Sequence, residues 1–248
     1  MIKRLAIVVP CYNEEEALPD TDKVLNDLMK DLVKREVVKP NSFILYVNDG
    51  SMDKTWDVIK NAYKNSEYVH GLNLAGNKGH QNALLAGLMQ VKDEVDVTIS
   101  IDADLQDDVG VIEEMVEKYY AGCDIIYGVR NDRTSDSGFK KFTAEAFYKL
   151  MNYMGAKTVY NSADFRLMSN RALDELSLYS ETHLFLRGLA PELGFKTDCV
   201  YYKRSPRLKG ESKYPLKKML SFAFNGVTSF SDKPLTLILY LGFIAILI

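Results

Sequence analysis

Short apolar runs alternate with amphipathic segments along the first half of the chain. Five of these runs have the length and β-branched content of buried strands, at 5–9, 43–47, 69–74, 97–101 and 125–127. The segments between most of them show helical spacing and open near a capping or turn residue, which predicts helices at about 14–35, 54–64, 80–91 and 109–121. This βαβα order predicts an α/β fold with a mostly parallel sheet flanked by helices.

Polar clusters follow the predicted strands at the points where they end. The clusters are CYNE at 11–14, NDGS at 48–51, AGNKG at 75–79 and DAD at 102–104. In open α/β sheets, ligands bind beyond the carboxyl ends of the strands. The polar clusters therefore occupy the positions where this architecture places a site.

Asp102 and Asp104 directly follow a predicted strand and are candidate metal ligands. Residues i and i+2 share one face of a strand, so the two acids can converge on one cation if the chain stays extended there, and Gln106 could add a third oxygen. Mg²⁺ or Mn²⁺ usually takes one or two protein carboxylates and completes its shell with water and substrate phosphates. The alternative is that these acids only turn the chain, with Asp107 or Asp108 capping the next helix.

Charge is distributed unevenly along the 248 residues, whose formal net charge is −3. The stretch 203–218 holds seven Lys or Arg and one acid, a local charge of +6, so the rest of the chain carries −9. An acidic body argues against general nucleic-acid binding, whereas a local basic stretch fits phosphate groups or an anionic membrane surface. Three cysteines without CxxC spacing argue against a disulfide framework or a zinc site and favour a reducing compartment.

The last residues, LTLILYLGFIAILI at 235–248, are 14 uncharged and largely apolar positions. A membrane span needs about twenty, so we expect the start of a transmembrane helix that is cut short, with a buried or interfacial helix as the alternative. Upstream, apolar residues at helical spacing predict an amphipathic helix on a membrane surface, or an ordinary core-facing helix: Leu216, Leu220, Ala223, Phe224 and Val227. The expected organisation is a catalytic domain at 1–213, a juxtamembrane segment at 214–232 and the start of a transmembrane helix at 233–248.

Together, the strand-end motifs resemble those of family two glycosyltransferases with the GT-A fold. The motifs are VPCYNEEEAL at 9–18, NDGSMDKTWDVI at 48–59, GNKGHQNALLAGL at 76–88 and DADLQDD at 102–108. Further motifs are similar to those of polyprenyl-phosphate glycosyltransferases: GVRNDR at 128–133, ADFRLMS at 163–169, FLRGL at 185–189 and RLKGESKYPLKKML at 207–220. That group contains dolichol-phosphate mannose synthases and bacterial undecaprenyl-phosphate glucosyltransferases. The similarity extends over residues 4–231, and the joint order of the motifs makes it specific.

The resemblance implies residues that hold a nucleotide sugar. The first strand end and the NDGS acid hold the nucleoside in this family, which implicates Pro10, Tyr12, Glu14 and Asp49. A tyrosine ring can stack on a base, and an aspartate can accept a base N–H. The sugar nucleotide would also contact the side chain of Lys78, the candidate metal ligand Asp102 and its neighbour Ala103. Ser51 and Asp53 could instead form only a turn and a helix cap.

Basic residues are expected to bind phosphate. Arg130 and Arg133 follow a predicted strand and could clamp a donor or acceptor phosphate. Arg204, Arg207 and Lys213 form a second basic group, although a lone lysine on a loop is usually a solvated charge.

Asp164 is the carboxylate that the family places near the acceptor, and we assign it a base or orienting role beside Asp104 and Arg130 as the catalytic set. Arg166 could equally be its salt-bridge partner, which would make the pair structural. His80 stays unassigned, because a histidine at a helix start is more often a hydrogen-bonding or packing residue.

The resemblance implies an inverting transferase that depends on Mg²⁺ or Mn²⁺. It would move a hexose or N-acetylhexosamine from a nucleotide-diphosphate sugar, with UDP favoured, to a polyprenyl phosphate such as undecaprenyl phosphate at the cytoplasmic face of the cell membrane. A lipid phosphate has a second pKa near 6, so a strong general base is optional. The alternatives are a transferase acting on a polysaccharide and a non-catalytic nucleotide-binding membrane adaptor. No nucleic-acid partner is expected, and a homo-oligomer is compatible with the sequence.

Overall fold

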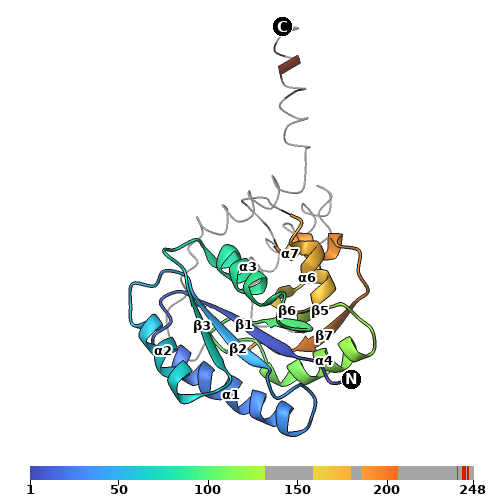
Figure 1. The fold of residues 1–248 in the computed structure, drawn as a ribbon. Coiled ribbons are helices and arrows are strands. Elements are labelled where there is room, and N and C mark those ends of the chain that lie inside the picture. Colours follow the sequence, from blue (N-terminus) through green and yellow to red (C-terminus); the bar gives the residue numbers. More distant parts are fainter. Residues whose placement is uncertain (132–158, 180–185, 206–238, 240–241, 244, 246–248) are drawn as a thin grey trace. The chain divides into compact units, whose positions relative to one another are not determined.

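The computed structural model describes residues 1–131, 159–179 and 186–205, together with positions 239, 242, 243 and 245 (Figure 1). The chain divides into two compact units. The larger unit comprises Met1–Asp132, Asn161–Ser180 and Leu193–Glu211. The smaller one comprises Arg133–Tyr160, Glu181–Glu192 and Ser212–Ile248, and its described helix is α7 (Leu186–Glu192). The candidate site residues that the structure describes belong to the larger unit.

A seven-stranded sheet forms the centre of the larger unit, within the described residues, with the strand order β3-β2-β1-β4-β6-β5-β7. Its strands are β1 (Leu5–Cys11), β2 (Phe43–Asn48), β3 (Val69–Asn73), β4 (Val97–Ser100), β5 (Ile125–Arg130), β6 (Ser162–Ser169) and β7 (Thr197–Tyr202). Strand β6 runs antiparallel between β4 and β5, and the other pairs are parallel. The expected α/β fold with a mostly parallel sheet is therefore confirmed.

Helices cover both faces of this sheet. Figure 1 shows α1, α2 and α4 on one face and α3 and α6 on the other. Their bounds are α1 (Leu18–Lys34), α2 (Thr55–Asn65), α3 (His80–Val91), α4 (Ile112–Tyr120) and α6 (Asn170–Leu176). The bounds of α3 agree with its prediction, whereas α1 begins four residues later than expected because 14–17 form a turn closed by the Leu18 N–H donating to the Glu14 carbonyl.

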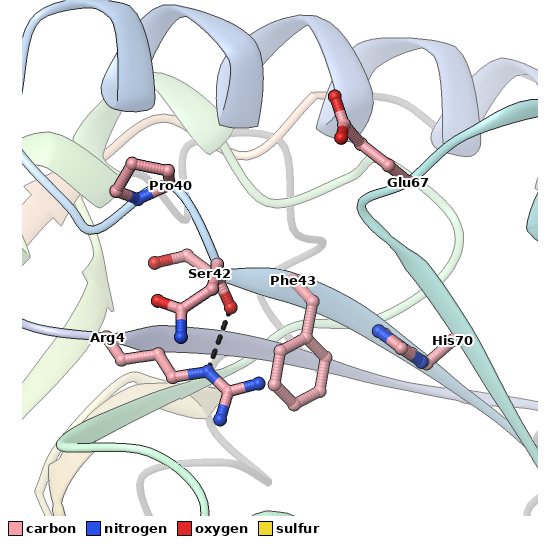
Figure 2. A pocket seen from close by; sticks show the side chains of 7 residues that line it. Arg4, Pro40, Ser42, Phe43, Glu67 and His70 are labelled. Carbon is pink, nitrogen blue, oxygen red and sulfur yellow. Dashed lines mark hydrogen bonds between the residues drawn. The ribbon is translucent and has the colours of Figure 1, made fainter.

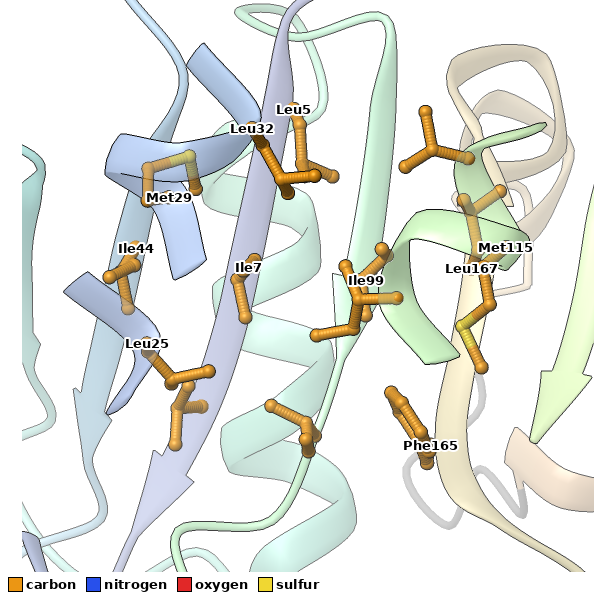
Figure 3. Close-up of a cluster of buried hydrophobic side chains, with 14 of the residues drawn as sticks. Leu5, Ile7, Leu25, Met29, Leu32, Ile44, Ile99, Met115, Phe165 and Leu167 are labelled. Atoms are coloured by element: carbon orange, nitrogen blue, oxygen red, sulfur yellow. The ribbon is translucent and has the colours of Figure 1, made fainter. Parts of the chain in front are cut away.

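The core lies between the sheet and the first of these helix layers (Figure 3). Alternate residues of the strands point into it, and apolar residues one turn apart on α1 and α4 meet them. The fully buried members include Leu5, Ile7, Ile44, Ile99, Leu25, Met29, Leu32 and Met115. Full burial of one such side chain stabilises the fold by about 1.5–3 kcal/mol, so this layer holds the strand ends in fixed positions.

Helix α3 packs closely on the opposite face of the sheet. A Cβ atom on Gly87 would lie 2.5 Å from Val8 Cγ1 and 2.7 Å from Val47 Cγ2, so only a glycine allows this approach. The close packing fixes the start of α3, at His80, relative to the ends of β1 and β2.

Strands β6 and β7 were not predicted from the sequence.

Within the described residues, no helix combines the length and apolar character that a membrane crossing requires. The expected juxtamembrane segment at 214–232 lies outside the described residues, as does the segment at 233–248 except for positions 239, 242, 243 and 245. The expected domain boundaries stay predictions.

Candidate active site at the carboxyl ends of the strands

The loop after β1 carries three of the residues expected to hold a nucleoside. Pro10 is buried within β1, whereas Tyr12 and Glu14 lie just beyond the strand and are partly exposed. The Glu14 backbone N–H donates to Thr55 Oγ1 at 2.8 Å. This bond ties the loop after β1 to the start of α2, beside the NDGS motif.

Ser51 and Asp53 hold these loops together. Ser51 Oγ accepts from the Asn13 backbone N–H at 2.9 Å. Asp53 accepts from the backbone N–H groups of Thr55 at 3.0 Å and Glu15 at 3.2 Å. Ser51 therefore joins the loop after β2 to the loop after β1, and Asp53 binds the first backbone N–H of α2, whose N-cap position is Lys54.

Asp49 connects the loop after β2 to the loop before α3. Its side chain is 2% exposed, and its two oxygens accept from the backbone N–H groups of Lys78 at 2.6 Å and Gly79 at 3.0 Å. Gly50 has φ +62°, and a Cβ on it would lie 2.4 Å from the Asn77 nitrogen, so this contact requires glycine. Asp49, expected to bind a nucleoside, thus holds the backbone of the GNKG loop, while the Lys78 side chain is exposed.

The two metal-side acids lie beyond the end of β4, with Asp102 before a turn and Asp104 on it. Strand β4 ends at Ser100, Ala103 and Asp104 form a turn, and Leu105 has φ +51°. Asp104 Oδ1 accepts from the Gln106 backbone N–H at 3.2 Å. The condition that the chain stays extended over 102–104 is therefore not met, because Ala103 and Asp104 turn the chain.

Asp102 combines an exposed and a buried oxygen. The side chain is 31% exposed, yet Oδ1 is buried and has no hydrogen-bond partner among the described residues. Burial raises the pKa of Asp102 to about 6, His80 opposes the rise, and the nearby Asp107, Asp164 and Asp104 add to it. A buried carboxylate oxygen without a donor fits a cation or a proton.

The residues around Asp102 fit a divalent cation that is shared with substrate. Within the described ranges, no group of three His, Cys, Asp or Glu side chains could hold a metal ion by itself. Mg²⁺ and Mn²⁺ commonly bind through one or two carboxylates plus substrate phosphates, so Asp102 and Asp104 suffice for such a site.

Gln106 was expected to supply a third metal oxygen, but it binds the segment that follows β7. Its Oε1 accepts a hydrogen bond from Arg204 Nη2, and its backbone carbonyl accepts from the Ser205 N–H at 2.9 Å. Arg204, expected at a phosphate, is thereby held against the metal-side loop.

Asp164 lies on β6, and its side chain is 3% exposed. Arg166 Nη2 donates to Oδ1 at 3.0 Å, and Gln81 Nε2 donates to Oδ2 at 2.9 Å. His80 Nε2 lies 3.2 Å from the same Oδ2 and 3.5 Å from Asp102 Oδ1. The ion pair with Arg166 confirms the proposed structural contact, but α3 also links this carboxylate to the metal-side loop.

His80 and Gln81 are the site residues that the sequence did not assign. The available signal was their place at the end of the GNKGHQ motif, at a predicted helix start. Their partners lie far along the chain, since Asp102 is 22 residues from His80 and Asp164 is 83 residues from Gln81.

Arg130 belongs to a buried polar cluster at the end of β5. Its Nη2 donates to Asp107 Oδ1 at 3.1 Å, and the Tyr202 hydroxyl donates to the same oxygen at 2.6 Å. Burial, with Asp107 adding to it, raises the pKa of Tyr202, so the hydroxyl stays a donor. Asp107 is therefore not a helix cap; Asp108 is, since its Oδ1 accepts from the Gly110 N–H at 2.9 Å.

Three of the expected phosphate-binding residues, Arg133, Arg207 and Lys213, lie outside the described residues.

A shallow pocket of about 370 Å³ lies at the opposite, amino ends of the strands (Figure 2). Arg4 fills part of it, donating from Nε to the Asn41 carbonyl at 2.8 Å and stacking 5.1 Å from the centre of the Phe43 ring. His70 packs edge-on against the same ring at 4.7 Å. These groups bind one another, and the pocket is separate from the carboxylates described above.

Comparison with known proteins agrees with this geometry. The sequence profile of glycosyl transferase family 2 matches residues 6–177. The uncharacterized glycosyltransferase YkoT of Bacillus subtilis is 52% identical over 97% of this chain and 71% of its own length. The bactoprenol glucosyl transferase of Shigella phage SfX is 38% identical over 96% of this chain and 76% of its own length.

A solved structure shows the same fold at low sequence identity. Glucosyl-3-phosphoglycerate synthase from Mycobacterium tuberculosis, in complex with Mn²⁺, UDP and phosphoglyceric acid, superposes with a TM-score of 0.57. It is 14% identical, and the match covers 90% of this chain and 75% of that one. With the profile match over most of the sheet and relatives aligned along nearly the whole sequence, the chain belongs to glycosyl transferase family 2.

Proposed function

We propose that the protein transfers a hexose or N-acetylhexosamine from a UDP-sugar to a polyprenyl phosphate, in an inverting reaction that requires Mg²⁺ or Mn²⁺. The observation that carries the proposal is the meeting of Asp102 and Asp164 at His80 Nε2, at 3.5 and 3.2 Å. It joins a carboxylate suited to the donor diphosphate with one suited to the acceptor. The relative named as a bactoprenol glucosyl transferase supports a polyprenyl acceptor, and the neighbour with bound Mn²⁺ and UDP supports the cofactor and the donor.

Asp102 and Asp104 would hold the divalent cation. When bound there, the cation neutralises charge that develops on the departing nucleoside diphosphate. Arg130, held by Asp107 and Tyr202 at one edge of its guanidinium and 25% exposed, is suited to bind a phosphate with the remaining edge.

On the acceptor side, an oxygen of the lipid phosphate attacks the anomeric carbon while the bond from that carbon to the diphosphate breaks. Attack opposite the leaving group inverts the configuration and gives a β-linked product from an α-linked donor. The lipid phosphate is largely deprotonated at neutral pH, so the reaction does not need Asp164 as a base. Its task is to organise the acceptor side of the site, where its carboxylate holds the side chains of Arg166 and Gln81.

Transfer to a labelled lipid tests this function. The full chain is incubated with Mn²⁺, a short polyprenyl phosphate and radiolabelled UDP-glucose, UDP-N-acetylglucosamine or GDP-mannose. We expect label in the organic phase with a UDP-sugar, none with EDTA, and a loss of at least about 10²-fold for Asp102→Ala. Label in a saccharide fraction, with unlabelled lipid, would establish a polysaccharide acceptor. Nucleotide binding without any turnover would establish the adaptor.

We also propose that the reaction takes place at the cytoplasmic face of the membrane. Support comes from the charge of the stretch 203–218, which suits an anionic leaflet, and from the reducing compartment that three unpaired cysteines favour. Protease accessibility of the protein in inverted and right-side-out vesicles tests this placement.

A further inference from the structure

Two carboxylates approach the same imidazole at the site. Asp164 lies on β6, and Asp102 lies two residues beyond the end of β4, the strand that pairs antiparallel with β6. Asp102 Oδ1 is buried, and Asp164 is 2% exposed. Like charges gathered around one group repel each other, and more strongly where water is excluded. Such a pair needs a group that separates and orients it.

His80 is placed to do this. Its Nε2 lies 3.2 Å from Asp164 Oδ2 and 3.5 Å from Asp102 Oδ1. Ionised carboxylates only accept hydrogen bonds, so Nε2 carries the proton, and the shorter distance directs it to Asp164. Next to it, Gln81 Nε2 donates to the same Oδ2 at 2.9 Å.

The backbone that presents His80 is itself fixed. Gly79, the residue before α3, has φ +86°, and its N–H is held by Asp49. Seven residues after His80, Gly87 packs directly against β1 and β2. The imidazole is therefore presented from a rigid position, as a positioning group requires.

We propose that His80 is a positioning residue that, assisted by Gln81, holds the Asp164 carboxylate in register with Asp102 so that acceptor and donor meet in the reactive geometry. The inference rests on the proposed function, because it uses the acceptor-side role of Asp164. His80 acts through Asp164: it neither attacks nor protonates the substrate. A misplacement of about 1 Å can cost about 10²-fold in rate, so this contact controls turnover.

Single variants test the geometry. His80→Ala removes the donor, and we expect kcat to fall about 10- to 100-fold while the dissociation constant of the UDP-sugar, measured by calorimetry with Mn²⁺, stays close to wild type. His80→Gln keeps an N–H at a similar reach and should recover most of the rate. His70→Ala is the matched control, because His70 lines the pocket at the other end of the strands and should leave kcat unchanged.

A double-mutant cycle separates positioning from a merely structural role. If His80 acts through Asp164, then His80→Ala should have little further effect on kcat in an Asp164→Asn background. Equal fold-losses in both backgrounds, or an unchanged kcat in His80→Ala, would overturn the inference. If His80→Ala cannot be purified folded, Gln81→Leu replaces it in the same cycle, with the same expectation and the same overturning outcomes.

The proposed function can fail separately from this inference. A wild-type chain that labels no lipid contradicts the function, and the inference with it. A wild-type chain that labels lipid and a His80→Ala variant that does so equally fast contradict the inference alone.

Discussion

Three carboxylates at the strand ends differ in what their oxygens bind. Asp49 gives both oxygens to backbone N–H groups and so builds a loop. Asp164 is surrounded by side-chain donors that fix its orientation. Asp102 keeps a buried oxygen that has no hydrogen-bond partner in the part of the chain that the structure describes. Of the three, Asp102 is thus the carboxylate with capacity left for a cation, and its neighbour Asp104 shares the same loop.

Replacing Asp164 should separate turnover from donor binding. We expect Asp164→Asn to lower kcat by about 10²-fold or more, because the acceptor loses its oriented carboxylate. UDP-sugar affinity, measured by calorimetry, should stay nearly unchanged, and an equal loss in both measurements would contradict this division of roles.

The substitution also leaves the buried guanidinium of Arg166 without its charged partner, so the unfolding free energy should fall by about 3–5 kcal/mol. Asp124→Asn is the matched control: Asp124 is also buried beside an arginine, Arg171, but at the opposite end of β5. It should lower stability without the loss in kcat.

The raised pKa of Asp102 predicts that cation binding depends on pH. Since the pKa is raised to about 6, protons compete with Mn²⁺ below that pH, and the apparent Mn²⁺ affinity should fall up to about tenfold per pH unit. Calorimetric titration between pH 5 and 8 measures this, and Asp102→Asn should remove most of the dependence.

Without metal, the effect on folding has the opposite direction from that of an ordinary paired acid. The folded protein binds the Asp102 proton more tightly than the unfolded chain, whose pKa is near the usual 3.8. The stability due to this proton is present below about pH 4 and is lost as the pH rises through 6. Thermal unfolding of wild type and Asp102→Asn across this range should show the difference.

The sequence located several site residues but not their contacts. Asp102 and Asp104 stood out because they follow an apolar run, and Asp164 stood out because its ADFR motif resembles that of the family. His80 and Asp107 did not, because their roles depend on partners that the folded sheet brings from distant positions. The contacts of Gln106 could not be predicted for the same reason, since Arg204 and Ser205 come from 98 and 99 residues further along the chain.

Strand β6 lies between β4 and β5 and joins β3-β2-β1-β4 to β5-β7 in the sheet. Because it runs antiparallel to β4 and β5, its first residues lie where those strands end. Asp164, the third residue of β6, therefore falls at the carboxyl edge of the sheet, while Ser169 lies at the amino edge. A parallel strand in this position would carry Asp164 away from the site.

The hydroxyl of Tyr202, on β7, contacts Asp107 in the segment after β4, so we expect its removal to change stability and turnover. Tyr202→Phe removes the donor to Asp107 at 2.6 Å and should lower the unfolding free energy by about 1–3 kcal/mol, because a buried carboxylate oxygen loses a partner. Arg130 then loses one of its supports, so kcat should fall as well.

Denaturant titration and lipid transfer measure the two effects of Tyr202→Phe. Tyr201→Phe is the matched control on the same strand, since Tyr201 is 60% exposed. Equal behaviour of the two variants would contradict the role of the Tyr202 hydroxyl.

The regular part of the fold was predictable, and the irregular part was not. Strands β1 to β5 and the helices after the first four of them follow from apolar periodicity. Strand β6 was missed because Asp164 and Arg166 interrupt its apolar residues, although every position in it is buried. Asp164 and Arg166 form an ion pair with each other inside the sheet. The periodicity of apolar residues does not reveal such a pair.

The uneven charge of the whole chain predicts how it meets a membrane. The stretch 203–218 carries +6 while the rest carries −9, so binding should require anionic lipid. Each Lys or Arg near such a surface contributes about 1 kcal/mol, and salt screens the attraction.

Co-sedimentation with vesicles measures this binding. We expect binding to anionic vesicles at low salt, weaker binding at high salt, and a loss on replacing by glutamine Lys209, Lys213, Lys217 and Lys218. As a control, the same replacement is made at exposed lysines of α1 and α2: Lys23, Lys30, Lys34 and Lys64. Equal losses in the two variants would show that net charge, and not the basic stretch, governs binding.

Four consecutive residues, 78–81, connect the proposed donor side of the site to the proposed acceptor side. Asp49 holds Lys78 and Gly79, and the next two residues, His80 and Gln81, contact Asp164. We expect a donor that displaces Asp49 and an acceptor that engages Asp164 to act on this one segment. Their affinities are then thermodynamically linked, and each ligand changes the affinity for the other by the same factor. The free energy of the ternary complex is independent of which substrate arrives first.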